Sequence, residues 1–251
     1  MRSKYHHPSA RAGDARGLAP CFPREDSLSI PTDVTKAGDR LAGRGSLRPL
    51  FRASRARPAA TMRIIAGDAR GRKLKAPAGL ATRPTLARVR QSIFSRLAAR
   101  FGMSELRVLD LFAGTGSLGI EALSRGAAHV TFVEGARPAL AALRDNLAAL
   151  ALNQRARVIG SDIWTALEQL ARERARFDLI LLDPPYRRGW GEPVLSRLVE
   201  LELFAPGGWA VTEVSKLELA PASRPGLQRI SLATLGDHQI ALYRLEETAA
   251  E

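Results

Sequence analysis

The stretch Asp110-Leu111-Phe112-Ala113-Gly114-Thr115-Gly116 is a glycine-rich turn between two patterned segments. Residues 107–111 before and into it have the apolar content of a strand, and residues 117–125 after it have the apolar spacing of a helix. Open α/β sheets bind ligands at such turns, at the carboxyl ends of their strands. Glycines there let the backbone approach a ligand, and the helix N-terminus offers free N–H groups. We therefore expect a ligand site at this turn.

Strand-like and helix-like segments alternate from this turn onward. We expect strands at residues 107–111, 129–133, 157–159, 178–182 and 209–214, and helices at residues 117–125, 138–152, 163–173 and 192–201. This alternation predicts an α/β fold with a mostly parallel sheet that is covered on both faces. Residues 228–235 and 239–245 flank a turn-like link and predict a final antiparallel hairpin. Residues 215–226, which contain two prolines, are expected to form a weak helix at best.

The segment before the sheet predicts a small basic β-hairpin and one helix. Residues 63–67 and 72–75 read as short strands, with turn residues between them. The helix is expected to begin around Thr82-Arg83-Pro84-Thr85, because proline favours the first helical turn. The apolar residues that follow have helical spacing, which predicts a buried face and leaves Arg88 and Arg90 on the outer face.

The positive charge is concentrated in the N-terminal part of the chain. The net charge of +13 divides into +7 for residues 1–61, +9 for residues 62–100 and −3 for residues 101–251. A basic front end on a near-neutral body predicts a polyanionic partner that the front end binds. A merely arginine-rich surface is the alternative interpretation, and charge alone does not separate the two.

Composition also divides the chain into three parts. Residues 1–61 are rich in Arg, Pro, Gly, Ser and Ala without sustained periodicity, so we expect a disordered or non-native extension. Its five acidic residues make a transit peptide the weaker alternative. Residues 62–100 would then hold the hairpin and helix, and residues 101–251 the catalytic domain. No uncharged apolar run approaches the roughly 18 residues of a membrane span, so we expect a cytoplasmic protein, with a monomer as the default.

The reactive side chains exclude several chemistries. Cys21 is the single cysteine, which excludes an internal disulfide and a cysteine-based zinc site. Because it lies in the extension, it is also a poor candidate nucleophile. The four histidines have no ligand-like spacing, so we expect no metal site.

The glycine loop has two competing interpretations. Gly114, Gly116 and Gly119 satisfy the pattern G-x-G-x-x-G, and the acidic Glu134 follows Gly114 at the distance of a dinucleotide fingerprint. A nicotinamide dehydrogenase is therefore a serious rival. Asp110 argues against it, because a carboxylate just before the loop would repel a docked pyrophosphate.

Three acids follow successive predicted strands and suit a cationic cofactor. Asp110 can hold the amino group of a methionine moiety, Glu134 both ribose hydroxyls and Asp162 the adenine amino group. The sequence therefore predicts an S-adenosylmethionine site, with Phe112 and the loop glycines among its residues. A tight turn with helix-capping acids is the alternative.

A second motif, Asp183-Pro184-Pro185-Tyr186, follows the apolar run of the fourth sheet strand. Proline cannot continue a central strand, so this motif predicts a rigid loop beside the cofactor site. An exocyclic amine has a delocalised lone pair. If the Asp183 carboxylate and the Pro184 carbonyl accept its two N–H groups, the nitrogen can aim at a methyl group while Tyr186 stacks on the base. Taken alone, Asp-Pro-Pro is also a common turn.

These motifs resemble those of amino-group methyltransferases of nucleic acids, whose signature is Asp-Pro-Pro-Tyr. Residues 62–251 resemble the bacterial RsmD-type family, which methylates guanine N2 in 16S ribosomal RNA. The supporting stretches are Met62-Arg63-Ile64-Ile65-Ala66-Gly67, Gly71-Arg72-Lys73-Leu74, Thr82-Arg83-Pro84-Thr85, Arg88-Val89-Arg90, residues 110–119, Glu121-Ala122-Leu123-Ser124-Arg125-Gly126-Ala127 and residues 177–186. Two departures are Leu235-Gly236, where the family is expected to have Tyr-Gly, and residues 1–61, which have no counterpart.

The resemblance implies a Rossmann-like methyltransferase sheet of seven strands that ends in the antiparallel hairpin. It also implies that residues 82–90 cover the cofactor and that the basic hairpin meets RNA. The implied activity is methylation of the guanine-966 type, on small-subunit ribosomal RNA or on an assembly intermediate of the subunit. The expected RNA contacts are Arg72, Lys73, Arg83, Arg88 and Arg90.

Two other functions remain as alternatives. An amino-methyltransferase of DNA adenine or cytosine would share the loop chemistry, but such enzymes usually carry a sizeable target-recognition insertion, which this chain lacks. A non-catalytic RNA-binding module on the same fold is the other alternative. The intact Asp110, Glu134, Asp183 and Tyr186 argue against it.

Overall fold

The computed structural model describes residues 62–76, 84–185 and 189–246. Residues 1–61, Arg83 and Tyr186 lie outside these ranges, so the expectations about them stay predictions. Within the described ranges no helix is long and apolar enough to cross a membrane.

Seven strands form one mixed sheet, in the order β5-β4-β3-β6-β7-β9-β8. They are β3 (Arg107–Leu111), β4 (His129–Val133), β5 (Ala156–Ile159), β6 (Phe177–Leu182), β7 (Phe204–Ser215), β8 (Leu227–Leu235) and β9 (His238–Leu245). The first five strands of this order pair in parallel, whereas β9 is antiparallel to both β7 and β8. The predicted sheet and its final antiparallel hairpin are confirmed.

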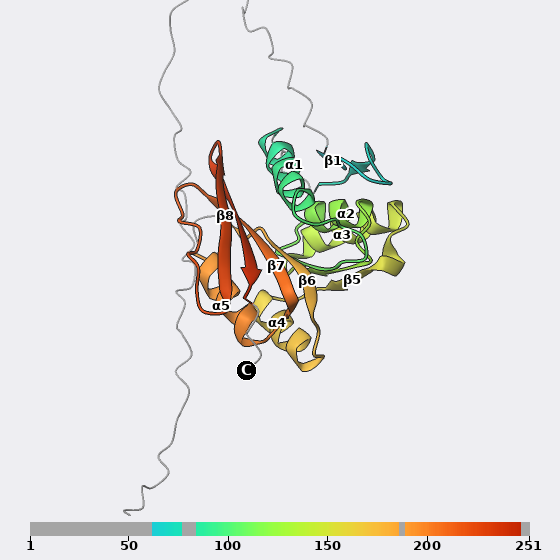
Figure 1. Ribbon diagram of the computed structural model, residues 1–251. Coiled ribbons are helices and arrows are strands. Elements are labelled where there is room, and N and C mark those ends of the chain that lie inside the picture. Colours follow the sequence, from blue (N-terminus) through green and yellow to red (C-terminus); the bar gives the residue numbers. More distant parts are fainter. Residues whose placement is uncertain (1–61, 77–83, 186–188, 247–251) are drawn as a thin grey trace, which may run out of the picture. The chain divides into compact units, whose positions relative to one another are not determined.

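Helices cover both faces of the sheet (Figure 1). They are α1 (Pro84–Ala98), α2 (Ser117–Ser124), α3 (Arg137–Ala149), α4 (Ile163–Arg172) and α5 (Gly191–Glu200). Helices α1, α2 and α3 share one hydrophobic core with the sheet, and α4 and α5 share the other. Strand residues alternate between the two cores: Val108 packs toward α1–α3, and Leu109 toward α4 and α5.

Some boundaries differ from the expected ones for local reasons. The helix expected at residues 138–152 ends at Ala149, and Ala151 adopts a left-handed conformation before the short 3-10 helix η1 (Asn153–Arg155). Residues 215–226 form no helix and contribute an isolated bridge between Arg224 and Leu227. Pro221 and Pro225 account for this, because proline lacks the N–H that a helix interior requires.

The N-terminal hairpin is shorter than expected. Its strands are β1 (Met62–Arg63) and β2 (Lys73–Leu74), which pair antiparallel. The backbone N–H groups of Ile65 and Ala66 donate to the carboxylate of Glu121 at 2.8 and 3.0 Å, so they do not extend the strand pairing. The Glu121 carboxylate, on α2, thus accepts the hydrogen bonds that a neighbouring strand would otherwise accept.

Glu121, on α2, is the polar centre that holds this hairpin in place. Its side chain is fully buried, and it also accepts a hydrogen bond from Nε of Arg125 at 2.8 Å. The guanidinium of Arg90, from α1, lies 3.8 Å from the same carboxylate and donates to the carbonyl of Arg63. The expectation that Arg90 lies on the outer face of its helix is therefore wrong. A buried carboxylate needs a cation, and Arg90 and Arg125 together supply the positive charge.

We predict that Glu121→Gln destabilises the protein strongly. The substitution leaves the buried Arg90 guanidinium without its counter-charge, and breaking a buried pair costs about 3–5 kcal/mol. Urea unfolding of the purified protein measures the loss. Glu202→Gln is the matched control, because the pair of Glu202 with Arg176 is exposed and should contribute about 0–1 kcal/mol. Equal losses for the two variants would contradict the role of Glu121.

Candidate functional site

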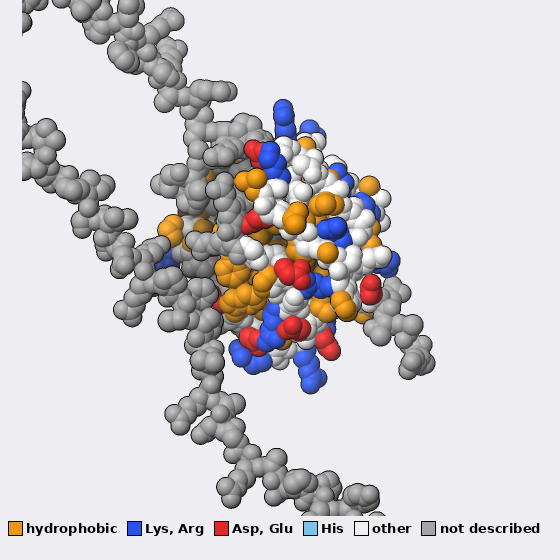
Figure 2. Space-filling model, turned by 90° about the vertical axis from the view of Figure 1, so that its left-hand side faces the viewer, with side chains coloured by type: hydrophobic (Ala, Val, Ile, Leu, Met, Phe, Trp, Pro, Cys, Tyr) orange, Lys and Arg blue, Asp and Glu red, His pale blue; other side chains and the backbone are white. Residues whose placement is uncertain are grey.

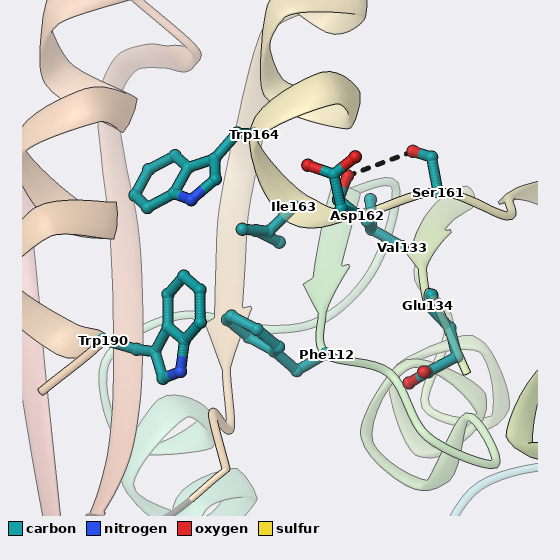
Figure 3. A pocket seen from close by; sticks show the side chains of 9 residues that line it. Phe112, Val133, Glu134, Ser161, Asp162, Ile163, Trp164 and Trp190 are labelled. Atoms are coloured by element: carbon teal, nitrogen blue, oxygen red, sulfur yellow. Dashed lines mark hydrogen bonds between the residues drawn. The ribbon is translucent and has the colours of Figure 1, made fainter. Parts of the chain in front are cut away.

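A cavity of about 240 Å³ opens at the carboxyl ends of β3, β4 and β5. Its lining residues are Phe112, Val133, Glu134, Gly135, Ser161, Asp162, Ile163, Trp164 and Trp190 (Figure 3). Three of the predicted cofactor residues, Phe112, Glu134 and Asp162, are therefore brought together around one cavity.

The glycine loop is shaped by close packing as well as by its turn. Gly116 has a φ of 83°, and an added Cβ would lie 2.4 Å from the Leu143 side chain. An added Cβ on Gly119 would lie 2.3 Å from the Phe132 ring. Larger residues do not fit at these two positions without movement of their neighbours. The loop and the start of α2 can therefore pack closely on the sheet.

Glu134 is oriented by two backbone donors, one on each carboxylate oxygen. The N–H of Gly114 donates to one carboxylate oxygen at 2.7 Å, and the N–H of Ala136 donates to the other, also at 2.7 Å. The side chain is half-buried at the end of β4. Each oxygen still has a lone pair available for a ligand hydroxyl.

Asp162 caps helix α4. Its carboxylate accepts hydrogen bonds from the backbone N–H of Thr165 at 3.0 Å and from the Thr165 hydroxyl at 2.6 Å. These bonds favour the charged form and lower the pKa of Asp162. The capping role that the sequence left open is therefore present, on a residue that also lines the cavity.

Asp110 lies behind the loop, with 1% of its surface exposed. Its carboxylate accepts a hydrogen bond from the Gly119 N–H at 2.8 Å. Burial raises the pKa of Asp110 to about 7; the hydrogen bond opposes this shift, and the nearby charge of Glu134 adds to it. The negative charge of Asp110 therefore depends on pH in the neutral range.

Two tryptophans were not among the predicted site residues. The ring of Trp190 lies 5.5 Å from that of Phe112 and 5.7 Å from that of Trp164, measured between centroids. Figure 3 shows these three rings along one side of the cavity, with Ile163 beside them. The indole nitrogen of Trp190 is buried without a partner among the described residues. A signal was present in the sequence, because Trp164 comes two positions after Asp162.

The predicted catalytic loop begins beside the glycine loop. Leu182, the last residue of β6, pairs with Leu111, so Asp183 and the loop after β3 leave the sheet side by side. Asp183 is half-buried and Pro184 is buried. Burial raises the pKa of Asp183 well above its usual range, and the charges of Glu213 and Asp110 raise it further.

The expected RNA contacts are separated by the fold. Arg72 and Lys73 are exposed on the hairpin, and Arg72 donates to the carbonyl of Ala149 at 2.9 Å. Arg88 is exposed on α1, whereas Arg90 is buried against Glu121. Three of the five expected contacts can thus reach a partner from the described surface.

The fold and the cavity define a Rossmann-like α/β methyltransferase. The family described as "Conserved hypothetical protein 95" matches residues 62–244. "Putative rRNA methyltransferase YlbH" from Bacillus subtilis is 38% identical over 183 residues, which are 73% of this chain and 98% of that protein. "Ribosomal RNA small subunit methyltransferase D" from Escherichia coli is 40% identical over 152 residues, which are 61% of this chain and 71% of that protein.

The solved structure described as "Putative methyltransferase yhhF from Escherichia coli" has a TM-score of 0.63 and 35% identity. The match covers 75% of this chain and all of that one. The chain belongs to the RsmD/YlbH family that these relatives represent. The prediction of an S-adenosylmethionine-dependent methyltransferase is confirmed at the level of the family.

We predict that Asp110→Asn stabilises the ligand-free protein above neutral pH. An acid whose pKa is raised by folding stabilises the protein at low pH, and this contribution disappears as pH rises from about 4 to about 7. The neutral amide avoids the cost of a buried charge, so the gain at pH 8 should approach about 4 kcal/mol.

Urea unfolding at pH 4 and pH 8 measures this difference. Little or no gain is expected at pH 4, where Asp110 is protonated. Asp145→Asn is the control at an exposed aspartate and should show no such pH dependence. A parent-like stability of Asp110→Asn at pH 8 would contradict the raised pKa.

Proposed function

We propose that this chain transfers a methyl group from S-adenosylmethionine to the N2 amine of a guanine in 16S ribosomal RNA, the guanine-966 type of activity. Family membership and the names of the relatives from B. subtilis and E. coli support RNA as the substrate class. The pairing of Leu111 with Leu182 carries the proposal, because it sets the cavity's loop beside Asp183.

The acids and rings around the cavity support the proposed cofactor. Glu134 can accept the ribose hydroxyls, and Asp162 can accept the adenine amino group. The rings of Phe112, Trp164 and Trp190 provide apolar surface for the adenine. Asp110, buried behind the glycine loop, would supply negative charge for a cationic methionine moiety once it is ionised.

The protein groups at Asp183 would orient the amine. In our proposal, the ionised Asp183 carboxylate and the Pro184 carbonyl each accept one N–H of the guanine amine. The bound cofactor supplies a methyl group on a sulfonium, which is a good leaving group. The amine nitrogen would form the new bond to the methyl carbon as the carbon–sulfur bond breaks to leave a neutral thioether, and one amine proton would then pass to bulk water. Tyr186 remains our proposed stacking partner for the base, although it lies outside the described residues.

The exposed basic residues would hold the RNA. Arg72 and Lys73 on the hairpin and Arg88 on α1 are the described candidates. Phosphate contacts of this kind position a nucleic acid without reading its sequence. Small-subunit RNA, or an assembly intermediate of the subunit, remains the proposed partner.

We predict that Asp183→Ala reduces methyl transfer by about a hundredfold or more, because the amine loses its orienting acceptor. Affinity for S-adenosylhomocysteine should stay within a few-fold of the parent. Asp183→Asn is the matched variant: its amide oxygen still accepts one N–H, so measurable residual activity should remain. Single-turnover assays on a ribosomal RNA fragment give the rates. A parent-like rate for Asp183→Ala would place the chemistry elsewhere.

We also predict that the double reversal Arg72→Glu/Lys73→Glu weakens RNA binding and leaves cofactor binding unchanged. The log–log dependence of RNA affinity on salt should become shallower by roughly 0.7–0.9 for each phosphate that the protein no longer neutralises. The control is Arg172→Glu/Arg174→Glu, which makes the same charge change at the exposed end of α4. If both pairs of substitutions weaken binding equally, the hairpin has no specific role.

A further inference from the structure

A second buried acid lies beside Asp183, on the next strand of the sheet. Glu213, on β7, has 4% of its surface exposed. Because Leu182 of β6 pairs with Thr212 of β7, Asp183 and Glu213 are the next residues along two parallel strands. Val211 packs in the core of α1–α3, so alternation places Glu213 on that same face.

A histidine on the following strand contacts this acid. Nδ1 of His238, at the start of β9, lies 2.8 Å from a carboxylate oxygen of Glu213. The His238 side chain is 13% exposed. Ile240 and Leu242 pack in the core of α1–α3, so alternation along β9 places His238 on that face too. Asp183 just after β6, Glu213 on β7 and His238 on β9 thus form a row across three neighbouring strands, in which His238 lies diagonal to Glu213 because it pairs with Ser215.

Other charged groups lie near this row, and one of them, Asp237, is close enough to His238 for their charges to interact. Asp110 acts on Asp183 from β3, on the other side of β6. The buried charges of the helices on this face, Arg90 and Glu121, lie 3.8 Å apart. At the turn before β9, Lys216 pairs with Asp237 at 2.5 Å. The structure thus pairs His238 with the acid next to Asp183.

We infer that Glu213 and His238 form a positioning pair that sets the pH above which Asp183 can accept the amine of the substrate. This inference rests on the proposed function, in which the ionised Asp183 carboxylate holds the guanine amine. A negative charge on Glu213 opposes ionisation of Asp183, and a positive charge on His238 offsets it. The pair acts on the reaction through Asp183 and touches no reacting atom.

Replacing Glu213 and replacing His238 should have opposite effects on the pH at which Asp183 ionises. Glu213→Gln removes the neighbouring negative charge, so Asp183 should ionise at lower pH, by about one pH unit or more. His238→Gln removes the offsetting cation, so Asp183 should ionise at higher pH. His238→Lys keeps a cation at the position and should restore the behaviour of the parent. His238→Gln should have a smaller effect in the Glu213→Gln background than in the parent, because the acid that pairs with His238 beside Asp183 is then gone.

Two measurements on the full chain test the inference. The first is the pH profile of single-turnover methyl transfer, whose acid limb should shift as stated for each variant. The second is the titration of the Asp183 carboxyl by carbon-13 NMR in aspartate-labelled protein, assigned with Asp183→Asn. Arg176→Gln is the matched control, because it removes a cation at the end of β6 opposite to Asp183 and should leave both profiles unchanged.

The NMR titration separates the inference from the proposed function, because it needs no RNA. A parent that leaves RNA unmethylated would contradict the proposed function, and the carboxyl titration would still decide the role of the pair. Unchanged Asp183 titrations in Glu213→Gln and His238→Gln would overturn the inference. A shift from His238→Gln that is equally large with and without Glu213 would also overturn the inference, because the two residues would then not act as a pair. If Glu213→Gln does not fold, His238→Gln and His238→Lys are compared instead. Equal Asp183 titrations in these two variants would overturn the inference.

Discussion

The pairing of β3 with β6 is the contact on which the rest of the site depends. It joins two strands that are far apart in the sequence, and it brings the loops after Leu111 and Leu182 to the same edge of the sheet. The right-handed crossovers between parallel strands then put helices on both faces. Gly116 and Gly119 let α2 pack closely enough to hold its N-terminus over Asp110. A cavity and a proposed catalytic loop therefore adjoin without any inserted segment.

This arrangement is electrostatically unfavourable, because it brings buried acids close together. Asp110, Asp183 and Glu213 end up near one another on one side of the sheet, and burial raises the pKa of the first two. Such acids are unfavourable in the empty protein and become favourable when a cation binds beside them. We see this as a site whose charge matches a sulfonium cofactor. The outer surface, in contrast, mixes charged and hydrophobic side chains, as Figure 2 shows for the side of the molecule at β8.

Much of the fold could be predicted from the sequence, because its signals are local. The apolar runs predicted six of the seven sheet strands to within one residue at each end, and β7 begins five residues before its predicted start. The loop after β3 lies where the glycines predicted it. The predictions that were wrong or absent concern residues whose positions depend on long-range contacts. Helical spacing placed Arg90 outside, since the pattern holds no information about the buried Glu121 that it meets. Trp164 and Trp190 were missed because apolar residues look like core until the cavity beside them is seen. The roles of individual site residues remain proposals, as local patterns do not specify a bound ligand.

The central claim is that this site methylates a guanine amine in small-subunit ribosomal RNA. The most direct measurement is nucleoside mass spectrometry of 16S ribosomal RNA, in free form and in subunits, after incubation with the protein and labelled S-adenosylmethionine. Our account predicts labelled N2-methylguanosine as the product, located at one position by mapping of the RNA fragments. Label on adenine or cytosine, or label in DNA with none in ribosomal RNA, would contradict it.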